Sequence, residues 1–156
     1  MAAGEVSELL GGAGPVIIDD TANIDNTVNI LVRRVLYHAG QVYVSAQRLF
    51  VHEDIADEFT TRFVDSVREL KAGDPVDPTT EVGPLIRLSA VERVADITEP
   101  GHDVHLGTEE IFGPVAAIYR YSDLEEAIGH ANLPNLYFHV RDMSIEGMVV
   151  YRSASL

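Results

Sequence analysis

Two stretches of the chain repeat apolar residues with the period of an α-helix. Between positions 24 and 36, apolar side chains recur every three or four residues and share one helix face. The same spacing returns between positions 55 and 70. Each stretch follows a predicted strand. The first is the short apolar run Val16–Ile18, which is typical of a buried strand, and the second strand candidate is Gln47–His52. The two helix faces consist of Ile24, Val28, Leu31, Val32, Val35 and Leu36, and of Ile55, Phe59, Phe63, Val67 and Leu70.

Polar residues and glycines indicate where these helices begin and end. Short side chains that carry an oxygen satisfy the free N–H groups at a helix start. Glycine readily adopts the left-handed conformation that often ends a helix, so Gly40 and Gly73 are the expected stops. The candidates for the N-cap are Asp19, Asp20 and Thr21 in the first helix and Asp54 in the second.

The second half of the chain continues the alternation of strands and helices. Ser122 and Glu125 have the spacing of a capping box, which predicts a helix start. The last two strand candidates are too close in sequence for a helical crossover, so either they pair antiparallel or one of them is misassigned. The pattern as a whole predicts a layered α/β domain with a largely parallel sheet. The expected elements are a weak helix, a strand, a short helix and two strands: Leu85–Ile97, Pro114–Tyr121, Ser122–Ala131, Leu136–Val140 and Met148–Tyr151.

Composition narrows the class of protein. A length of 156 residues fits one domain. The 25 acidic and 11 basic residues give a formal charge of −14, which disfavours nucleic acids and anionic membranes as partners. Lys71 is the only lysine, and both a salt-adapted protein and an ordinary acidic one fit this composition. No apolar run approaches the roughly 20 residues of a membrane span. The N-terminus lacks the pattern of a secretion signal, so a cytoplasmic location is expected.

Cysteine and histidine limit the metal chemistry. The chain has no cysteine, which excludes disulfides, thiolate metal sites and a thiol nucleophile. His102 and His105 lie three residues apart beside Asp103, in a loop-like stretch. Spacing alone is a weak signal for a metal cluster, and a solvated acidic loop is the favoured explanation. We therefore predict no metal site from the sequence.

Six parts of the chain, in order, resemble the aldehyde dehydrogenase superfamily. The most distinctive is Glu109–Val115, which reads Glu-Glu-Ile-Phe-Gly-Pro-Val. Each fragment alone would be weak, but six in family order make a chance match remote. The others are Glu8–Gly12 with Pro15–Asp20, Ala39–Arg48, Val51–Phe59, Gly73–Pro78 and Val82–Ile86.

The resemblance implies a three-layer α/β catalytic domain with a mostly parallel sheet, in a shortened form. Residues 1–156 are expected to form a catalytic-domain-like fragment without the family's Rossmann-like cofactor domain. Two blocks of the family's catalytic domain are expected to be deleted, one within Arg87–Glu110 and one at Met143–Ile145. The family reaction is the oxidation of an aldehyde to a carboxylate with NAD or NADP.

The residue at the family's nucleophile position is the main departure from its pattern. The catalytic cysteine of relatives follows a Gly-Gln-x motif, and here Tyr43 occupies that position. A phenol is bulkier than a thiol and forms no thioester, so the family chemistry is not expected here. The ring is expected to fill the former active-site space. Ser45 would share a face with Tyr43 if the segment were extended, but no activating base is identifiable.

The other positions of the family's site are only partly kept. The general base of relatives is a glutamate directly before Leu-Gly-Gly, whereas here Leu9 stands there and the acid is Glu8. In an extended segment that slip turns the carboxylate to the opposite face. By resemblance, Glu110 would bind the nicotinamide ribose and Phe112 would pack beside the ring. No phosphate-binding glycine motif is present, so NAD or NADP is not expected to bind to this chain alone.

Three functional hypotheses follow. The first is an aldehyde dehydrogenase-like protein that is inactive alone, with a small aldehyde as substrate only by resemblance. The second is a binding or scaffold module that self-associates or docks on a full-length relative, because loss of covering segments exposes apolar surface. The third is a gene remnant or engineered fragment without an evolved function.

Overall fold

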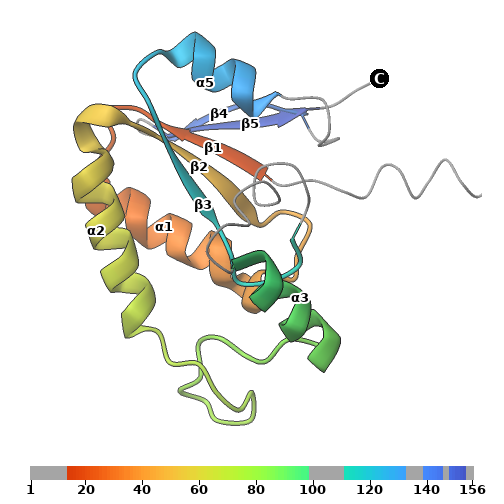
Figure 1. The fold of residues 1–156 in the computed structure, drawn as a ribbon. Coiled ribbons are helices and arrows are strands. Elements are labelled where there is room, and N and C mark those ends of the chain that lie inside the picture. The colour runs from red at the N-terminus through yellow and green to blue at the C-terminus, as the bar shows by residue number, and fades with distance from the viewer. Residues whose placement is uncertain (1–13, 99–110, 133–138, 146–147, 154–156) are drawn as a thin grey trace, which may run out of the picture.

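The computed structural model describes residues 14–98, 111–132, 139–145 and 148–153 (Figure 1). The predictions that concern Glu8, Glu110, His102 and His105 lie outside these residues. The first half contains strand β1 (Gly14–Ile18), helix α1 (Ile24–Leu36), strand β2 (Ala46–His52) and helix α2 (Glu53–Glu69). The second half contains helix α3 (Leu88–Thr98), strand β3 (Ala117–Tyr121), helix α5 (Leu124–Ala131) and strands β4 (His139–Ile145) and β5 (Met148–Ser153).

The strands form one mixed sheet in the order β3-β2-β1-β5-β4. β2 pairs parallel with both β1 and β3, whereas β5 pairs antiparallel with β1 and β4. β1, β2, β3 and β4 therefore run in one direction and β5 in the other. In Figure 1, α1 and α2 lie on one side of the sheet and α5 lies on the other. This three-layer α/β architecture with a mostly parallel sheet confirms the predicted fold class.

The final hairpin is antiparallel, as the short connection predicts, but its first strand lies further along the chain. β4 continues to Ile145, opposite Met148 of β5, so only residues 146–147 separate the two strands. The sequence-based boundary at Val140 was therefore five residues too early. The reason is that a paired neighbour extends a strand beyond the stretch that its own pattern marks.

Side chains of β1 and β2 are buried on both faces of the sheet. On the α1/α2 side, Val16, Ile18, Leu49 and Val51 pack with Leu31, Phe59 and other residues of the two helices. On the α5 side, Ile17 and Phe50 pack with Tyr121, Ala127 and Ala131. Parallel strands covered on both faces give continuous apolar runs in place of alternation. This explains why both strands appear in the sequence as short unbroken apolar stretches.

Helix α1 begins later than the polar cluster before it suggests. The side chain of Asn23 accepts a hydrogen bond from the backbone N–H of Asn26 at 3.0 Å, so Asn23 is the N-cap rather than any of the three predicted residues. The carboxylate of Asp19 accepts hydrogen bonds from the N–H and the hydroxyl of Thr21, at 2.9 and 2.6 Å. The prediction was wrong because these two side chains satisfy each other in the turn before the helix.

The caps of α2 and α5 also differ from the predicted residues. His52 caps α2, because its Nδ1 accepts the N–H of Asp54 at 3.3 Å. Asp123, and not Ser122, caps α5 by accepting the N–H of Glu126 at 2.9 Å. Each helix starts within two residues of the expected place. The end of the preceding strand decides which side chain reaches the free N–H groups.

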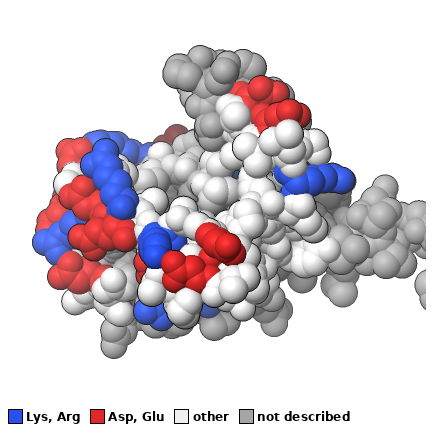
Figure 2. Space-filling view, turned by 90° about the horizontal axis from the view of Figure 1, so that it is seen from below, with Lys and Arg blue, Asp and Glu red and all other residues white. Residues whose placement is uncertain are grey.

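Charged side chains pair with one another on the surface. Arg62 contacts both Asp25 and Glu58, and thereby links α1 to α2. Arg120 of β3 pairs with Asp57 of α2. Figure 2 shows acidic and basic side chains intermixed over the α2 side of the molecule. Pairs of this kind are exposed, so each contributes at most about 1 kcal/mol. Within the described residues, no helix has the length and hydropathy that crossing a bilayer requires.

Arg48 is a buried cation that connects the sheet to α5. Its side chain is 2% exposed, and its guanidinium donates hydrogen bonds to the carbonyl oxygens of His130 and Ala131, at 3.2 and 3.1 Å. These carbonyls lie at the negative end of the helix dipole, where a cation is favourable. Burial lowers the pKa of Arg48, because desolvation penalises its charge. The residue thus supplies a donor to the buried carbonyl of Ala131 and a further donor to the carbonyl of His130.

Replacing Arg48 by Met should lower the free energy of unfolding by about 1–3 kcal/mol. Methionine fills similar space but leaves the two carbonyls without their donor. Urea denaturation followed by circular dichroism measures the change. Arg68→Met is the matched control, because Arg68 makes only an exposed pair with Asp65 and should cost less than about 1 kcal/mol. Equal losses in the two variants would contradict this role of Arg48.

Candidate functional site

A left-handed turn follows α1 and leads to the nucleophile position predicted from the sequence. His38, Ala39 and Gly40 have positive φ angles of 50°, 56° and 69°. This conformation costs a non-glycine residue about 1–2 kcal/mol, so the first two residues are strained. Gly40 was expected to end the helix, but α1 ends at Leu36 and Gly40 closes the turn four residues later.

Gly40 is required by a close approach as well as by its φ angle. A Cβ atom at this position would lie 1.9 Å from the carbonyl oxygen of Gly113. Gly113 is closely packed on its other side, where a Cβ atom would lie 2.5 Å from Cγ2 of Val94 in α3. Two segments 73 residues apart in the sequence therefore touch through their backbones, and Val94 of α3 packs against Gly113.

Two glutamine side chains hold the surrounding loops in place. Oε1 of Gln41 accepts the backbone N–H of Ile86 at 3.0 Å, and its Nε2 donates to the carbonyl oxygen of His38 at 3.2 Å. Gln47 accepts the N–H of Ile111 at 3.1 Å and donates to the carbonyl oxygen of the same residue. The side-chain amide of Gln47 thus bonds both backbone groups of Ile111, as a neighbouring strand would. It thereby fixes the backbone next to Phe112.

Tyr43 and Phe112, both predicted site residues, come together in the structure. Their ring centroids are 5.5 Å apart and the rings meet edge to face at 82°. Phe112 is half-buried and its carbonyl oxygen accepts a hydrogen bond from Arg93 of α3 at 3.3 Å. Tyr43 itself is 58% exposed. Its ring is therefore largely accessible, and the expectation that it occupies the former active-site space stays a prediction.

Ser45 is unavailable as a nucleophile. Its hydroxyl donates to the carbonyl oxygen of Val35 at 3.2 Å, next to that of Arg34 at 3.4 Å, at the end of α1. The residue is 1% exposed. The segment from 42 to 45 forms a turn in which the N–H of Ser45 donates to the carbonyl oxygen of Val42. The condition that would place Ser45 beside Tyr43, an extended backbone, is not met.

An open groove of about 360 Å³ lies next to Tyr43. Val42 and Val44, its two sequence neighbours, line the groove together with Tyr37. Arg33 and Arg34 complete the lining, and neither forms an ion pair with a described residue. An apolar surface with a few polar groups is typical of ligand-binding sites. The site thus combines an apolar groove with two unpaired positive charges.

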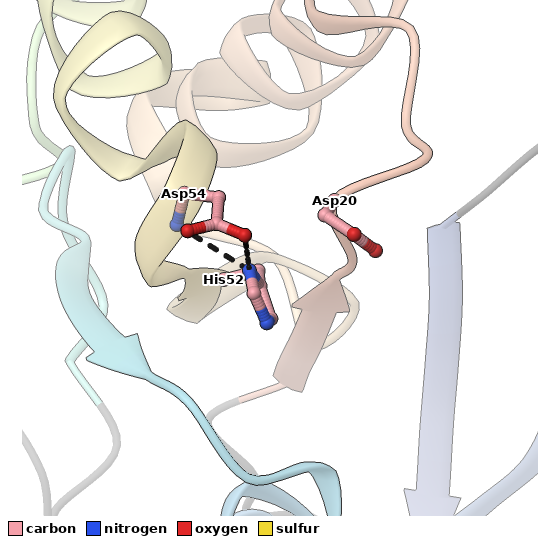
Figure 3. A group of neighbouring side chains, drawn as sticks. All are labelled: Asp20, His52 and Asp54. Carbon is pink, nitrogen blue, oxygen red and sulfur yellow. Dashed lines mark hydrogen bonds and ion pairs between the residues drawn. The ribbon is translucent and has the colours of Figure 1, made fainter.

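A second group of side chains lies at the opposite end of β2. Asp20 follows β1, His52 ends β2 and Asp54 lies in the first turn of α2 (Figure 3). One potential metal-ligating atom from each lies within 4.8 Å of the others. The sequence analysis did not predict this group. The usable signal was that Asp20 follows β1 and His52 ends β2, because the carboxyl ends of neighbouring parallel strands lie at one edge of the sheet.

Comparison with known proteins places this geometry in a family. A model of the aldehyde dehydrogenase family matches residues 2–106 and 97–136. The chain belongs to the aldehyde dehydrogenase family. The two matched segments meet at residues 97–106, inside the stretch Arg87–Glu110 where the sequence predicts a missing block.

Curated relatives and solved structures within the family agree. The NADP(+) succinate-semialdehyde dehydrogenase of Mycobacterium avium (strain 104) is 35% identical over 153 residues, covering 79% of this chain and 32% of the relative. A salicylaldehyde dehydrogenase from Pseudomonas putida G7, complexed with salicylaldehyde, superposes with a TM-score of 0.77 at 28% identity, covering 84% of this chain and 33% of that chain. A betaine aldehyde dehydrogenase from Staphylococcus aureus, in complex with NAD+, gives 0.71 at 26%, covering 78% and 31%. This chain therefore spans about a third of the relatives' length.

Gly40→Ala should destabilise the protein by more than about 2 kcal/mol. The added methyl group meets the backbone of Gly113, and the positive φ angle strains any L-residue. Thermal unfolding followed by circular dichroism measures the loss. His38→Gly is the matched control in the same turn, because it relieves a positive φ angle at an exposed residue and should leave stability within about 1 kcal/mol. A tolerated Gly40→Ala would contradict the close approach.

Proposed function

We propose that this chain is a non-catalytic member of the aldehyde dehydrogenase family. The observation that carries the proposal is Tyr43, an exposed phenol at the position predicted for the thiol nucleophile. No described residue hydrogen bonds to its hydroxyl, so no base is placed to activate it. The nearby hydroxyl of Ser45 is buried on helix carbonyls. With no cysteine in the chain, no thioester intermediate forms.

The proposal extends to the cofactor and the location of the protein. NAD or NADP is the cofactor of the family, and Phe112 is the one described residue predicted to lie beside the nicotinamide. One aromatic contact cannot hold a dinucleotide, whose affinity depends largely on its pyrophosphate. This chain alone is therefore expected to bind neither NAD nor NADP tightly. A cytoplasmic location fits the acidic, cysteine-free composition.

The purified chain should not produce NADH or NADPH from an aldehyde. The assay follows absorbance of the reduced cofactor with NAD+ or NADP+ and either succinate semialdehyde or a short alkyl aldehyde. Aldehyde-dependent reduction that disappears in Tyr43→Phe would overturn the proposal. Loss through Tyr43→Phe distinguishes chemistry at this site from a contaminating dehydrogenase, whose activity the substitution would leave unchanged.

Cysteine substitutions test the geometry on which the proposal rests. Tyr43→Cys introduces the only thiol of the chain at an exposed position, and it should react rapidly with a chromogenic disulfide reagent at one thiol per chain. Ser45→Cys places the thiol two residues away, where the side chain is buried, and should react at least about tenfold more slowly. Equal rates for the two variants would contradict the difference in exposure between positions 43 and 45.

A second candidate function is a binding module that self-associates or docks on a full-length relative. It is favoured by the apolar surface around Tyr43: Tyr37, Tyr43 and Val44 are 61%, 58% and 57% exposed. Arg33 and Arg34 flank this surface without ion pairs to described residues, in a chain with a net charge of −14. A second copy or an acidic relative would supply both complementary charge and apolar cover.

Association through this surface should appear as concentration-dependent mass in size-exclusion chromatography with light scattering. The double variant Tyr37→Ser with Val44→Ser should be monomeric, because it removes exposed apolar area without touching the core. Val76→Ser is the control, since Val76 is 86% exposed in a different loop. A monomeric wild-type chain that also fails to bind a full-length relative would rule out this candidate.

A further inference from the structure

We propose that Asp20, His52 and Asp54 form a site for a divalent transition-metal ion. The three residues come from the ends of two adjacent parallel strands and from the first turn of α2. One potential ligand atom from each lies within 4.8 Å of the other two. An ion that binds three ligands at about 2.0–2.2 Å draws such atoms closer together, which small side-chain rotations of exposed aspartates can supply.

The imidazole is held in a fixed place. The ring of His52 meets that of Tyr121 edge to face, with centroids 5.3 Å apart and an interplanar angle of 89°. The hydroxyl of Tyr121 in turn donates to the carbonyl oxygen of Ile18 in β1 at 3.2 Å. His52 itself is half-buried, whereas both aspartates are exposed. One ligand is therefore preorganised by the sheet, and two flexible carboxylates can close on an ion from the solvent side.

Among the described residues, neither carboxylate has an arginine or lysine partner. Oδ2 of Asp54 lies 3.6 Å from Nδ1 of His52. Asp20 forms neither an ion pair nor a hydrogen bond with a described residue. Some other surface carboxylates, such as Asp25 and Asp57, do have arginine partners. A divalent cation would neutralise the pair of charges that the protein leaves uncompensated here.

The hydrogen bond by which His52 caps α2 competes only weakly with a metal ion for Nδ1. Nδ1 of His52 accepts the N–H of Asp54 over 3.3 Å, a long hydrogen bond. The positive end of the α2 dipole disfavours a cation, but Glu53 and Asp54 in the first turn offset it. One imidazole with two carboxylates suits ions such as Zn²⁺, Co²⁺ or Mn²⁺. Water would complete the coordination, since the aspartates are exposed.

Bound metal would tie the loop after β1 to the start of α2. It would thereby stabilise the folded chain, because an ion that binds only the folded state shifts the unfolding equilibrium. The site lies at the end of β2 away from Tyr43, so this proposal is independent of the proposed function at Tyr43.

The test is titration of the metal-free chain with Zn²⁺ by calorimetry, with the visible spectrum of Co²⁺ as a second readout. We expect one ion per chain and an increase in the melting temperature. Asp20→Asn should weaken Zn²⁺ binding by at least about tenfold, the loss typical of even a supporting group at a metal site. This variant keeps the helix cap of His52, so it should fold as the wild type does.

Two further variants locate the ion. His52→Gln should also weaken binding, whereas the control His130→Ala should not, since His130 lies on α5 away from the group. The double variant His102→Ala with His105→Ala should bind Zn²⁺ as the wild type does. The proposal is overturned if the wild-type chain takes up no Zn²⁺, if Asp20→Asn binds as tightly as the wild type, or if loss of His102 and His105 abolishes binding.

Discussion

Strand β2 is buried on both faces and hydrogen bonded along both edges, to β1 on one side and β3 on the other. A shift of one residue in its register would turn Leu49 and Val51 from the α1/α2 side of the sheet to the α5 side, and Phe50 the other way. Because the strand cannot shift, its two ends are fixed points in the molecule. The turn that carries Tyr43 precedes one end, and His52 forms the other.

The turn before β2 is held in place by contacts with distant parts of the chain. Gly40 lies against Gly113, Gln41 holds Ile86 and Gln47 holds Ile111, so two distant segments, one at Ile86 and one at 111–113, converge on this place. Strained residues persist only where the surrounding structure over-determines them. The two non-glycine residues with positive φ angles are consistent with a frame built for precise positioning. Within that frame lies Tyr43, the residue that the sequence predicts at the family's nucleophile position.

The structure shows how the few basic residues of this acidic chain are used. Most of the described ones make specific contacts, such as those of Arg48 with the carbonyls of α5 and of Arg62 between α1 and α2. Among the described residues, Arg33 and Arg34 beside the apolar groove form no ion pair. At the other end of β2, Asp20 forms no ion pair with a described residue, and Asp54 has only His52 as a partner among them.

The amino-acid sequence by itself determined the order and type of the elements, the α/β class and the family. These follow from local periodicity and from short motifs, so they need no knowledge of distant contacts. It also predicts, by resemblance to the family, that Tyr43 stands in place of a cysteine. The caps were missed, because turns such as that of Asp19 and Thr21 satisfy polar groups before the helix begins.

Only the tertiary structure decided which residues meet. The contact of Gly40 with Gly113, the burial of Ser45 on the carbonyls of α1 and the grouping of Asp20 with His52 all join segments that the sequence separates. Such contacts depend on strand order and register, which arise from packing of the whole sheet. A pattern of apolar residues records which face of an element is buried, but it does not record the neighbour that buries it.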